Sequence, residues 1–285
     1  MKNLIRALLC FCVHGICFAQ QPYTVSGNLA KIHDPRPVAA LADLIQERYG
    51  VPVNYEDIRT VFAGDIVDET APQARLRNPQ ALALGRKWGT LEVTLVSPAS
   101  TVEERLPQAK ALIADALAQH VSRGQNGMFD VTGGARGLYL IPKLSRGRDG
   151  KLAMSTSPLD LFIVIPPARM TAEQCFDTIV SKLNETGAVK IIPGIQPSNF
   201  LIQATGICEA QNEPARDVVE RVLRFTRPGE AVGPTTTTRS ERPVFVWRLL
   251  YDIKLETYAL NIVPAMKLVR SRFGGHDYTE ITTTP

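Results

Sequence analysis

The sequence predicts an α+β fold made of two tandem β-α-β-β-α-β-β units, each with two helices packed on short mixed or antiparallel sheets. Three observations predict it. Four segments carry apolar residues at helical spacing, runs rich in β-branched residues lie between them, and both halves of the chain show the same order of elements. The halves share pattern and little residue identity. The alternative is one continuous α/β domain whose halves look alike by coincidence.

The chain begins with the pattern of a secretory signal peptide. Lys2 and Arg6 precede an apolar run that ends in small residues, so we predict cleavage between Ala19 and Gln20. The apolar run has about half of the ~20 residues that a bilayer-spanning helix needs, and no later run reaches that length. We therefore expect an exported protein, periplasmic or secreted, without a transmembrane segment in the mature chain.

The order of elements divides the chain into five parts. These are the signal peptide (1–19), a first unit (22–142) with an insertion at about 58–89, a linker (143–158), a second unit (159–264) and a mobile tail (265–285). The linker is rich in Gly, Arg and Lys, which suits a solvated connection. Contact of its basic residues with an anionic envelope surface is the alternative.

In the first unit, a helix is predicted over Val38–Tyr49, because Gly50 follows as a C-terminal stop. The second helix is predicted over residues 107–120, and a hairpin with its turn at Gly133-Gly134 follows it. Strands are predicted at YTVSG (from 23), VPVNY (from 51) and TLEVTLV (from 90).

In the second unit, a capping box at Thr171 and Gln174 opens a helix that ends at Gly187. The next helix is predicted to start with Asn212 as its N-cap and Pro214 in its first turn. Strands are predicted at LDLFIVI (from 159), VKIIPG (from 189) and NFLIQATG (from 199). The closing hairpin reverses near residues 253–254 and places on one face Phe245, Trp247, Leu249 and Tyr251.

Two of the five cysteines remain after the predicted cleavage, Cys175 and Cys208. An even number in an oxidising compartment predicts a disulfide, and free reactive thiols are the alternative. Cys175 falls in a predicted helix and Cys208 between a predicted strand and the next helix, so the two belong to neighbouring elements.

Charge and composition exclude some classes of function. The formal net charge is +4, and removal of Lys2 and Arg6 leaves about +2 over segments of mixed sign, so no nucleic-acid footprint is present. The histidines at 33, 120 and 276 are isolated, and no serine lies in a Gly-x-Ser-x-Gly turn. The glycine-rich stretch 133–137 joins two strands and is no phosphate loop. We therefore predict no catalytic residue, no metal ligand and no cofactor site.

Adjacent acidic residues are the remaining candidates for acid–base chemistry. They are Glu56-Asp57, Asp68-Glu69 and Glu103-Glu104. Two carboxylates in different environments can hold different protonation states. Pairs of this kind are more often surface residues, and that is the expectation for all three.

One family resemblance follows from the first helix and the strand after it. The residues that carry it are Leu41, Leu44, Ile45, Gly50, Val51, Val53 and Tyr55. This pattern resembles the short N-terminal domain of secretins and TonB receptors, an STN-like domain, and the second unit fits its order of elements less closely. The resemblance implies a small docking module that meets other envelope proteins. It implies no catalytic residue.

The leading hypothesis is an exported, non-enzymatic envelope module that binds a protein partner by strand addition at a sheet edge or hairpin. The alternative is a ligand-binding protein or an enzyme acting on an envelope polymer or glycan, with a cleft between the units. Four aromatic residues are candidates for the ligand or partner surface, and packing in the core is the simpler role for them. They are Tyr55, Trp247, Tyr251 and Tyr258. The sequence leaves the oligomeric state open.

Overall fold

The computed structural model describes residues 22–134, 137–187, 189–225, 244–270 and 276–280. The predicted signal peptide, with its cleavage site between Ala19 and Gln20, lies outside these ranges. The helices are α1 (Pro37–Tyr49), α2 (Pro72–Arg77), α3 (Val102–Ser122), α4 (Ala172–Thr186), α5 (Ser198–Leu201) and α6 (Ala215–Phe225). None of the described helices is long and apolar enough to cross a membrane.

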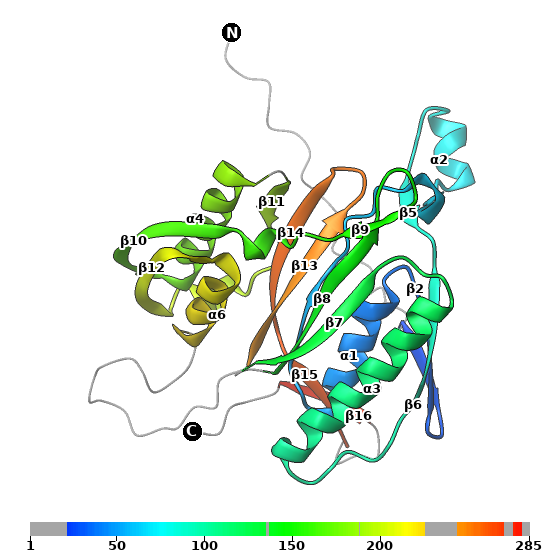
Figure 1. The fold of residues 1–285 in the computed structure, drawn as a ribbon, viewed down its shortest axis with the longest axis horizontal. Coiled ribbons are helices and arrows are strands. Elements are labelled where there is room, and N and C mark those ends of the chain that lie inside the picture. Colours follow the sequence, from blue (N-terminus) through cyan, green and yellow to red (C-terminus); the bar gives the residue numbers. More distant parts are fainter. Residues whose placement is uncertain (1–21, 135–136, 188, 226–243, 271–275, 281–285) are drawn as a thin grey trace.

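The strands belong to one large sheet and four small ones (Figure 1). Their bounds are β1 (Tyr23–Ser26), β2 (Leu29–Asp34), β3 (Val53–Glu56), β4 (Ile66–Asp68), β5 (Leu84–Arg86), β6 (Gly89–Thr94), β7 (Met128–Gly134), β8 (Gly137–Arg146), β9 (Leu152–Met154), β10 (Phe162–Thr171), β11 (Lys190–Pro193), β12 (Thr205–Pro214), β13 (Phe245–Asp252), β14 (Thr257–Pro264), β15 (Met266–Arg270) and β16 (His276–Glu280). The predicted α+β class is confirmed.

The same set of strand pairings occurs twice along the chain. In the first unit, β2 pairs antiparallel with β6, while β8 pairs parallel with β3 and antiparallel with β7. In the second unit, β10 pairs antiparallel with β12, while β14 pairs parallel with β11 and antiparallel with β13. In each unit the two long helices pack between these two groups of strands. The two units therefore have the predicted β-α-β-β-α-β-β organisation.

Side-chain bonds from the first helix of each unit show which residues correspond. In the first unit, Gln46 Oε1 accepts a hydrogen bond from the Val53 N–H at 3.4 Å. In the second, Asn184 Oδ1 accepts one from the Ile191 N–H at 2.8 Å, across the same separation of seven residues. Val53 on β3 therefore corresponds to Ile191 on β11.

The two units share one mixed sheet with the strand order β11-β14-β13-β3-β8-β7, and β9 pairs with the end of β8. The junction is the parallel pairing of β13 with β3. Val53 and Tyr55 point into the first unit's core, whereas Glu56, one residue further along β3, lies opposite Leu249 of the second unit's core. Because side chains alternate along a strand, the two cores lie on opposite faces of the shared sheet.

Each unit extends a side chain across this junction. Arg248 of β13 bonds to the carbonyl oxygen of Val53 and, at 2.8 Å, to Oδ1 of Asp43 on α1. In the other direction, Glu56 of β3 lies 3.4 Å from Arg216 on α6. The two units are therefore joined by buried side chains as well as by backbone pairing.

Local signals set several boundaries as predicted. Gly50 ends α1 in the left-handed conformation, with φ of 64°, which glycine adopts without the steric cost of a Cβ. Thr171 and Gln174 form the predicted capping box of α4. Cys175 of α4 and Cys208 of β12 form the predicted disulfide, with their Cα atoms 5.8 Å apart.

The predicted first residues of two helices and one strand are wrong. Helix α3 begins at Val102, because the side chain of Thr101 accepts a hydrogen bond from the Glu104 N–H, and Pro107 lies inside the helix. Asn212 is no N-cap: it is the extra residue of a bulge in β12, where its φ of 54° suits asparagine. Residues 198–201 form α5, so the strand predicted from 199 begins only at Thr205.

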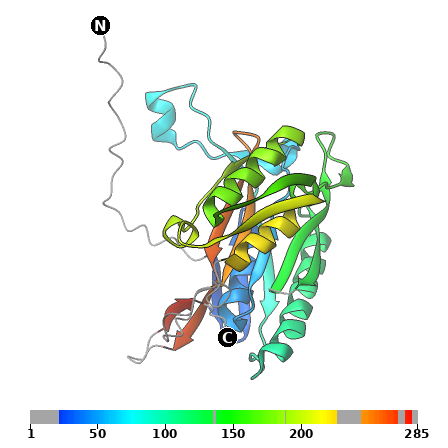
Figure 2. The same ribbon diagram turned by 90° about the vertical axis from the view of Figure 1, so that its left-hand side faces the viewer.

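Other predicted segments contain regular structure. Gly133 and Gly134 pair with β8 as part of β7, and the two residues that follow them lie outside the described ranges. The predicted linker holds the end of β8 and β9, the insertion at 58–89 holds β4, α2 and β5, and the tail holds the pair β15–β16. Figures 1 and 2 both show α2 standing away from the shared sheet.

Candidate functional site

The four aromatic residues predicted for a binding surface are all buried. Tyr251 and Tyr258 pack against each other with their ring centres 5.0 Å apart, and Trp247 Nε1 donates to Glu220 Oε1 at 2.9 Å. They cannot form an exposed surface, because the alternation along β13 turns Trp247 and Tyr251 into the second unit's core. Tyr55 also lines a pocket.

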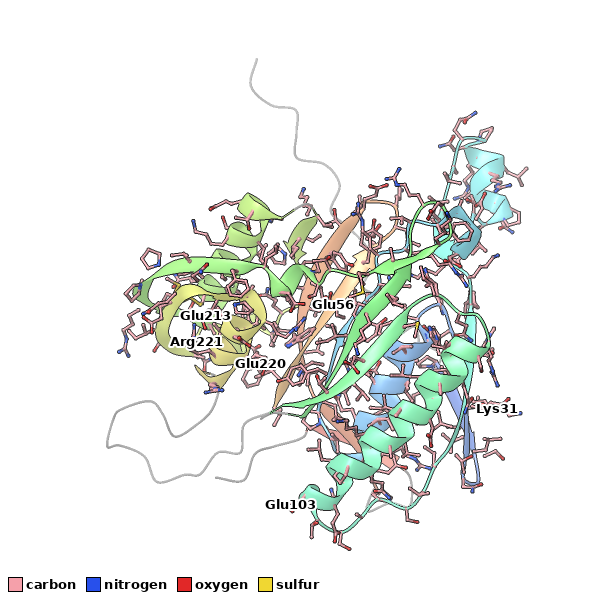
Figure 3. The ribbon with its side chains drawn as sticks, viewed as in Figure 1. Lys31, Glu56, Glu103, Glu213, Glu220 and Arg221 are labelled. Atoms are coloured by element: carbon pink, nitrogen blue, oxygen red, sulfur yellow. A yellow bond between two sulfur atoms is a disulfide. The ribbon has the colours of Figure 1, made fainter. Side chains whose placement is uncertain are left out.

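The acidic pair Glu56-Asp57 is also buried, against the expectation of a surface pair. Figure 3 places Glu56 in the middle of the molecule and Glu103 at the far end of α3. The reason is the position of the pair at the end of β3, where the two units meet. Each carboxylate is enclosed there by arginines that are distant in sequence.

Asp57 is fully buried and lies at the centre of an ionic cluster. Its Oδ1 accepts bonds from Arg86 Nη1 at 2.6 Å and the Tyr55 hydroxyl at 2.8 Å, and its Oδ2 accepts one from Arg36 Nε at 2.9 Å. The Tyr251 N–H donates to the same Oδ2 at 3.1 Å, and the Asp57 N–H donates to the Leu249 carbonyl at 2.8 Å. Asp57 thus fixes β13 to β3 and holds two guanidinium groups beside them.

The charge on Asp57 is stable in this position. Burial by itself raises the pKa of a carboxyl group, but the two arginines outweigh it here and hold the pKa of Asp57 below its usual value. The carboxylate is therefore ionised at neutral pH and balances one of the two positive charges of Arg36 and Arg86.

Glu56 faces the second unit and has a different environment. Its Oε2 accepts a bond from the Ser157 hydroxyl at 2.6 Å and lies 3.4 Å from Arg216, while its Oε1 has no partner among the described residues. Burial raises the pKa of Glu56 to about 7, against the opposing effects of Ser157 and Arg216. Two adjacent carboxyl groups therefore differ in charge state over a wide range of pH.

Replacing Glu56 with glutamine is expected to stabilise the protein at pH 8. Between its ordinary pKa of 4.5 and about 7, the folded protein holds a proton that the unfolded chain has released, so the free energy of unfolding falls as pH rises. The full effect is about 3 kcal/mol. Urea unfolding from pH 4 to 8 should show this loss in the unchanged protein and a flatter profile in the variant.

The matched control for this prediction is Glu92→Gln, at an exposed position on β6. It should leave the profile unchanged. A Glu56→Gln protein that loses stability with pH as steeply as the parent between pH 5 and 7 would show that Glu56 is not the responsible group.

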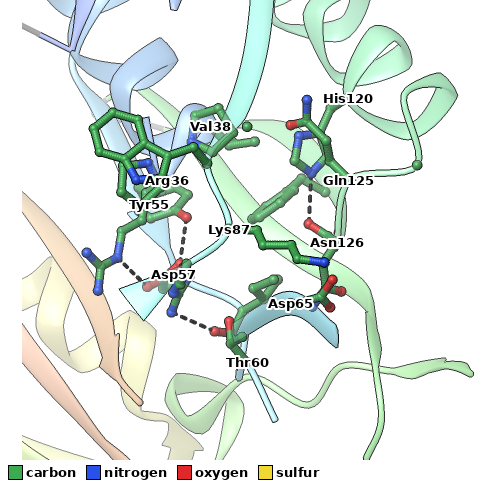
Figure 4. Close-up of a pocket in the computed structure, with 18 residues that line it drawn as sticks. Arg36, Val38, Tyr55, Asp57, Thr60, Asp65, Lys87, His120, Gln125 and Asn126 are labelled. Carbon is green, nitrogen blue, oxygen red and sulfur yellow. Dashed lines mark hydrogen bonds and ion pairs between the residues drawn. The ribbon is translucent and has the colours of Figure 1, made fainter. Parts of the chain in front are cut away.

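A cavity of about 180 Å³ lies beside the Asp57 cluster in the first unit. Figure 4 shows Arg36, Tyr55 and Asp57 on one side of it and His120, Gln125 and Asn126 on the other, with Thr60 and Asp65 below. The lining side chains come from the segments around α1 and β3, the residues before β6, and the end of α3. Trp88, with 55% of its surface exposed, is also part of the wall.

Six polar atoms of this wall are buried without a hydrogen-bond partner among the described residues. They are Thr60 Oγ1, Asp65 Oδ2, Arg86 Nε, His120 Nδ1, Gln125 Oε1 and Asn126 Nδ2. Buried polar groups are nearly always bonded in native proteins, so such a concentration in one place indicates a site for something polar. Sequence reasoning missed these residues because they lie far apart along the chain.

A second feature of functional interest is the outer edge of β10. Among the described residues, β10 has one strand neighbour, β12. Three apolar side chains of this pair point outward and are exposed: Phe162 at 59%, Val164 at 58% and Ile207 at 49%. An open strand edge beside apolar side chains is a recognised template for binding another strand.

The remaining sequence candidates do not assemble into a reaction centre. Asp68 pairs with Arg75 at an exposed position, and the ring of His33 packs against Trp88 at 4.8 Å. Within the described ranges, no three His, Cys, Asp or Glu side chains gather as a metal site. Comparisons of the chain with protein-family models, with curated proteins and with solved structures each find no match.

Proposed function

We propose that this chain is an exported, non-enzymatic interaction module that binds an extended segment of an envelope protein by strand addition to β10. The observation that carries the proposal is a difference between the two units. In the first unit, β2 has β6 on one side and β1 on the other. In the second unit, the corresponding strand β10 has only β12 among the residues that the structure describes.

The pairing of β1 with β2 is the intramolecular model for this interaction. It is antiparallel and covers four residues, from Tyr23 opposite Ile32 to Ser26 opposite Leu29. A partner strand on β10 would take the position that β1 takes in the first unit. Residues 162–165 form a stretch of the same length as β1. Pro166 and Pro167 follow it and have no backbone N–H to donate.

Apolar side chains add affinity and preference to such a pairing. In strand addition, backbone hydrogen bonds supply binding and the alternate side chains supply specificity. Phe162 and Val164 both point to the exposed face of β10, so a partner with apolar residues at alternate positions would cover them.

The compartment in this proposal rests on two features. The first nineteen residues have the pattern of a signal peptide, and the Cys175–Cys208 disulfide suits an oxidising environment. The resemblance to the short secretin and TonB-receptor N-terminal domain, carried by the first helix and strand, supports an envelope docking role.

Site-specific photocrosslinking in the native host tests the proposal. A benzoylphenylalanine residue replaces Val164 on β10 in one variant and Val25, an exposed residue of β1, in the other. We expect a reproducible crosslinked protein at position 164 only. A synthetic peptide of the crosslinked segment should then bind the purified protein and slow hydrogen exchange in the amides of β10.

Two charge substitutions complete the experiment. Val164→Lys should weaken binding of that peptide by tenfold or more, about 1.4 kcal/mol, and Val25→Lys should leave it unchanged. Equal crosslinking at both positions, or peptide binding that Val164→Lys does not alter, would overturn the proposal.

A further inference from the structure

We infer that the cavity beside Asp57 binds a single sugar ring or a similarly small neutral polyol. This site lies in the first unit and is independent of the strand edge proposed above. Its lining includes Thr60, Arg86 and His120, each more than nine-tenths buried and each with an unpartnered polar atom.

The unpartnered atoms include both donors and acceptors. Arg86 Nε and Asn126 Nδ2 donate, and the Thr60 hydroxyl donates or accepts. Asp65 Oδ2 and Gln125 Oε1 accept. A sugar hydroxyl group both donates and accepts, so several hydroxyl groups on one ring satisfy such a mixed wall.

His120 adds an acceptor to the same wall. Its Nε2 lies 2.8 Å from the carbonyl oxygen of Asn126, so this nitrogen carries the hydrogen. The Nδ1 atom is then an unprotonated acceptor. Burial lowers the pKa of His120, which keeps the ring neutral.

The mixture of charges and acceptor atoms in the wall disfavours a strongly ionic ligand. Asp57 balances one of the two positive charges of Arg36 and Arg86, and Asp65 Oδ1 is paired with Arg146 at 2.6 Å. An anion would face the acceptors of Asp65, Gln125 and His120. A cation would find one unpaired carboxylate oxygen and the guanidinium of Arg86 beside it. A neutral ligand avoids both conflicts.

The wall also offers an aromatic face. Trp88 lines the cavity, is exposed over 55% of its surface and packs against the ring of His33. A flat apolar surface beside convergent polar groups suits the combination of C–H and O–H groups on a sugar ring. The cavity of about 180 Å³ is small, which favours one ring over a longer chain.

Quenching of tryptophan fluorescence by acrylamide tests the inference on the purified full-length mature chain. The chain has two tryptophans, and Trp247 is fully buried, so the accessible signal comes from Trp88. The probes are N-acetylglucosamine, glucose and myo-inositol, with inorganic phosphate and magnesium as ionic comparisons. We expect at least one of the three neutral probes to protect Trp88, with a dissociation constant on the order of 1 mM.

Two variants locate the site. Thr60→Val removes one hydroxyl group and should weaken binding about fivefold, the value of one hydrogen bond. Its matched control is Thr94→Val. Thr94 is exposed and lies at the end of β6 opposite to Gly89, which lines the cavity. Trp88→Ala changes an exposed residue, so the fold is kept, and the same probe should then give smaller shifts of the Asn126 side-chain amide in NMR spectra.

The outcomes separate clearly. Protection of Trp88 by a neutral probe, together with an Asn126 amide shift, supports the inference. Tighter binding of phosphate or magnesium than of any neutral probe would overturn it. The absence of any response up to the solubility limit of all three neutral probes would also overturn it, and would assign the unpartnered atoms to ordered water.

Discussion

Replacing Asp57 with alanine is expected to lower the free energy of unfolding by about 3 to 5 kcal/mol. The loss arises because Arg36 and Arg86 would remain beside the junction without their carboxylate. Removing one partner of a buried ionic cluster leaves an uncompensated charge, which costs far more than a surface pair contributes. Urea unfolding at pH 7, followed by circular dichroism, measures the difference.

Two further variants make this result interpretable. Asp68→Ala breaks an exposed ion pair with Arg75 and should change stability by less than about 1 kcal/mol. Asp57→Asn keeps a bond acceptor and should fall between Asp57→Ala and the parent. If Asp57→Ala proves no more harmful than Asp68→Ala, the cluster does not hold the two units together.

The Asp57 cluster also predicts how the protein responds to acid. The folded-state pKa of Asp57 lies below the usual pKa of an aspartate. The cluster therefore stabilises the fold at pH values above that usual pKa. This contribution is lost as pH falls through the folded-state pKa. The Asp57→Ala variant should therefore lose less stability between pH 5 and pH 2 than the parent does.

The second large effect concerns the disulfide. Replacing both Cys175 and Cys208 with alanine is expected to cost about 4 kcal/mol in the chain-entropy model, since the bond closes a loop with a sequence separation of 33. Alanine is preferred to serine because both positions are buried. Urea unfolding with and without dithiothreitol gives the measurement.

The reductant supplies the control for this prediction. Dithiothreitol should bring the unchanged protein to the stability of the double variant, and the variant itself should not respond. Full stability of the parent under reducing conditions would show that the bond contributes little to the fold.

Local features were predictable because they depend on neighbouring residues. Gly50 ends α1 and the capping box opens α4, since these geometries involve only residues a few positions apart. The disulfide was predictable because only two cysteines remain after the predicted cleavage. Alternation along β13 correctly placed Trp247 and Tyr251 on one face, although it did not show that this face is buried.

The candidate sites were not predictable in the same way. The cavity joins Arg86, His120 and residues near β3, which no local periodicity connects. The burial of Glu56 and Asp57 depends on β13 arriving beside β3, almost two hundred positions later in the chain. The pairing of a strand of one unit with a strand of the other cannot be recognised from the sequence pattern of either unit alone.

The junction between the units has a consequence for assembly. The strand pairings relate the two units by a 180° rotation combined with a translation along the rotation axis. This axis lies in the plane of the shared sheet and runs perpendicular to the strands. This operation does not close on itself, so its repetition would build a filament. Pro193 and Ile195 take the places of Tyr55 and Asp57 at the edge where a third unit would attach. Proline has no N–H, and the Ile195 N–H already donates to Asn261 Oδ1 at 2.8 Å, so neither residue offers a free N–H to a third unit at this edge.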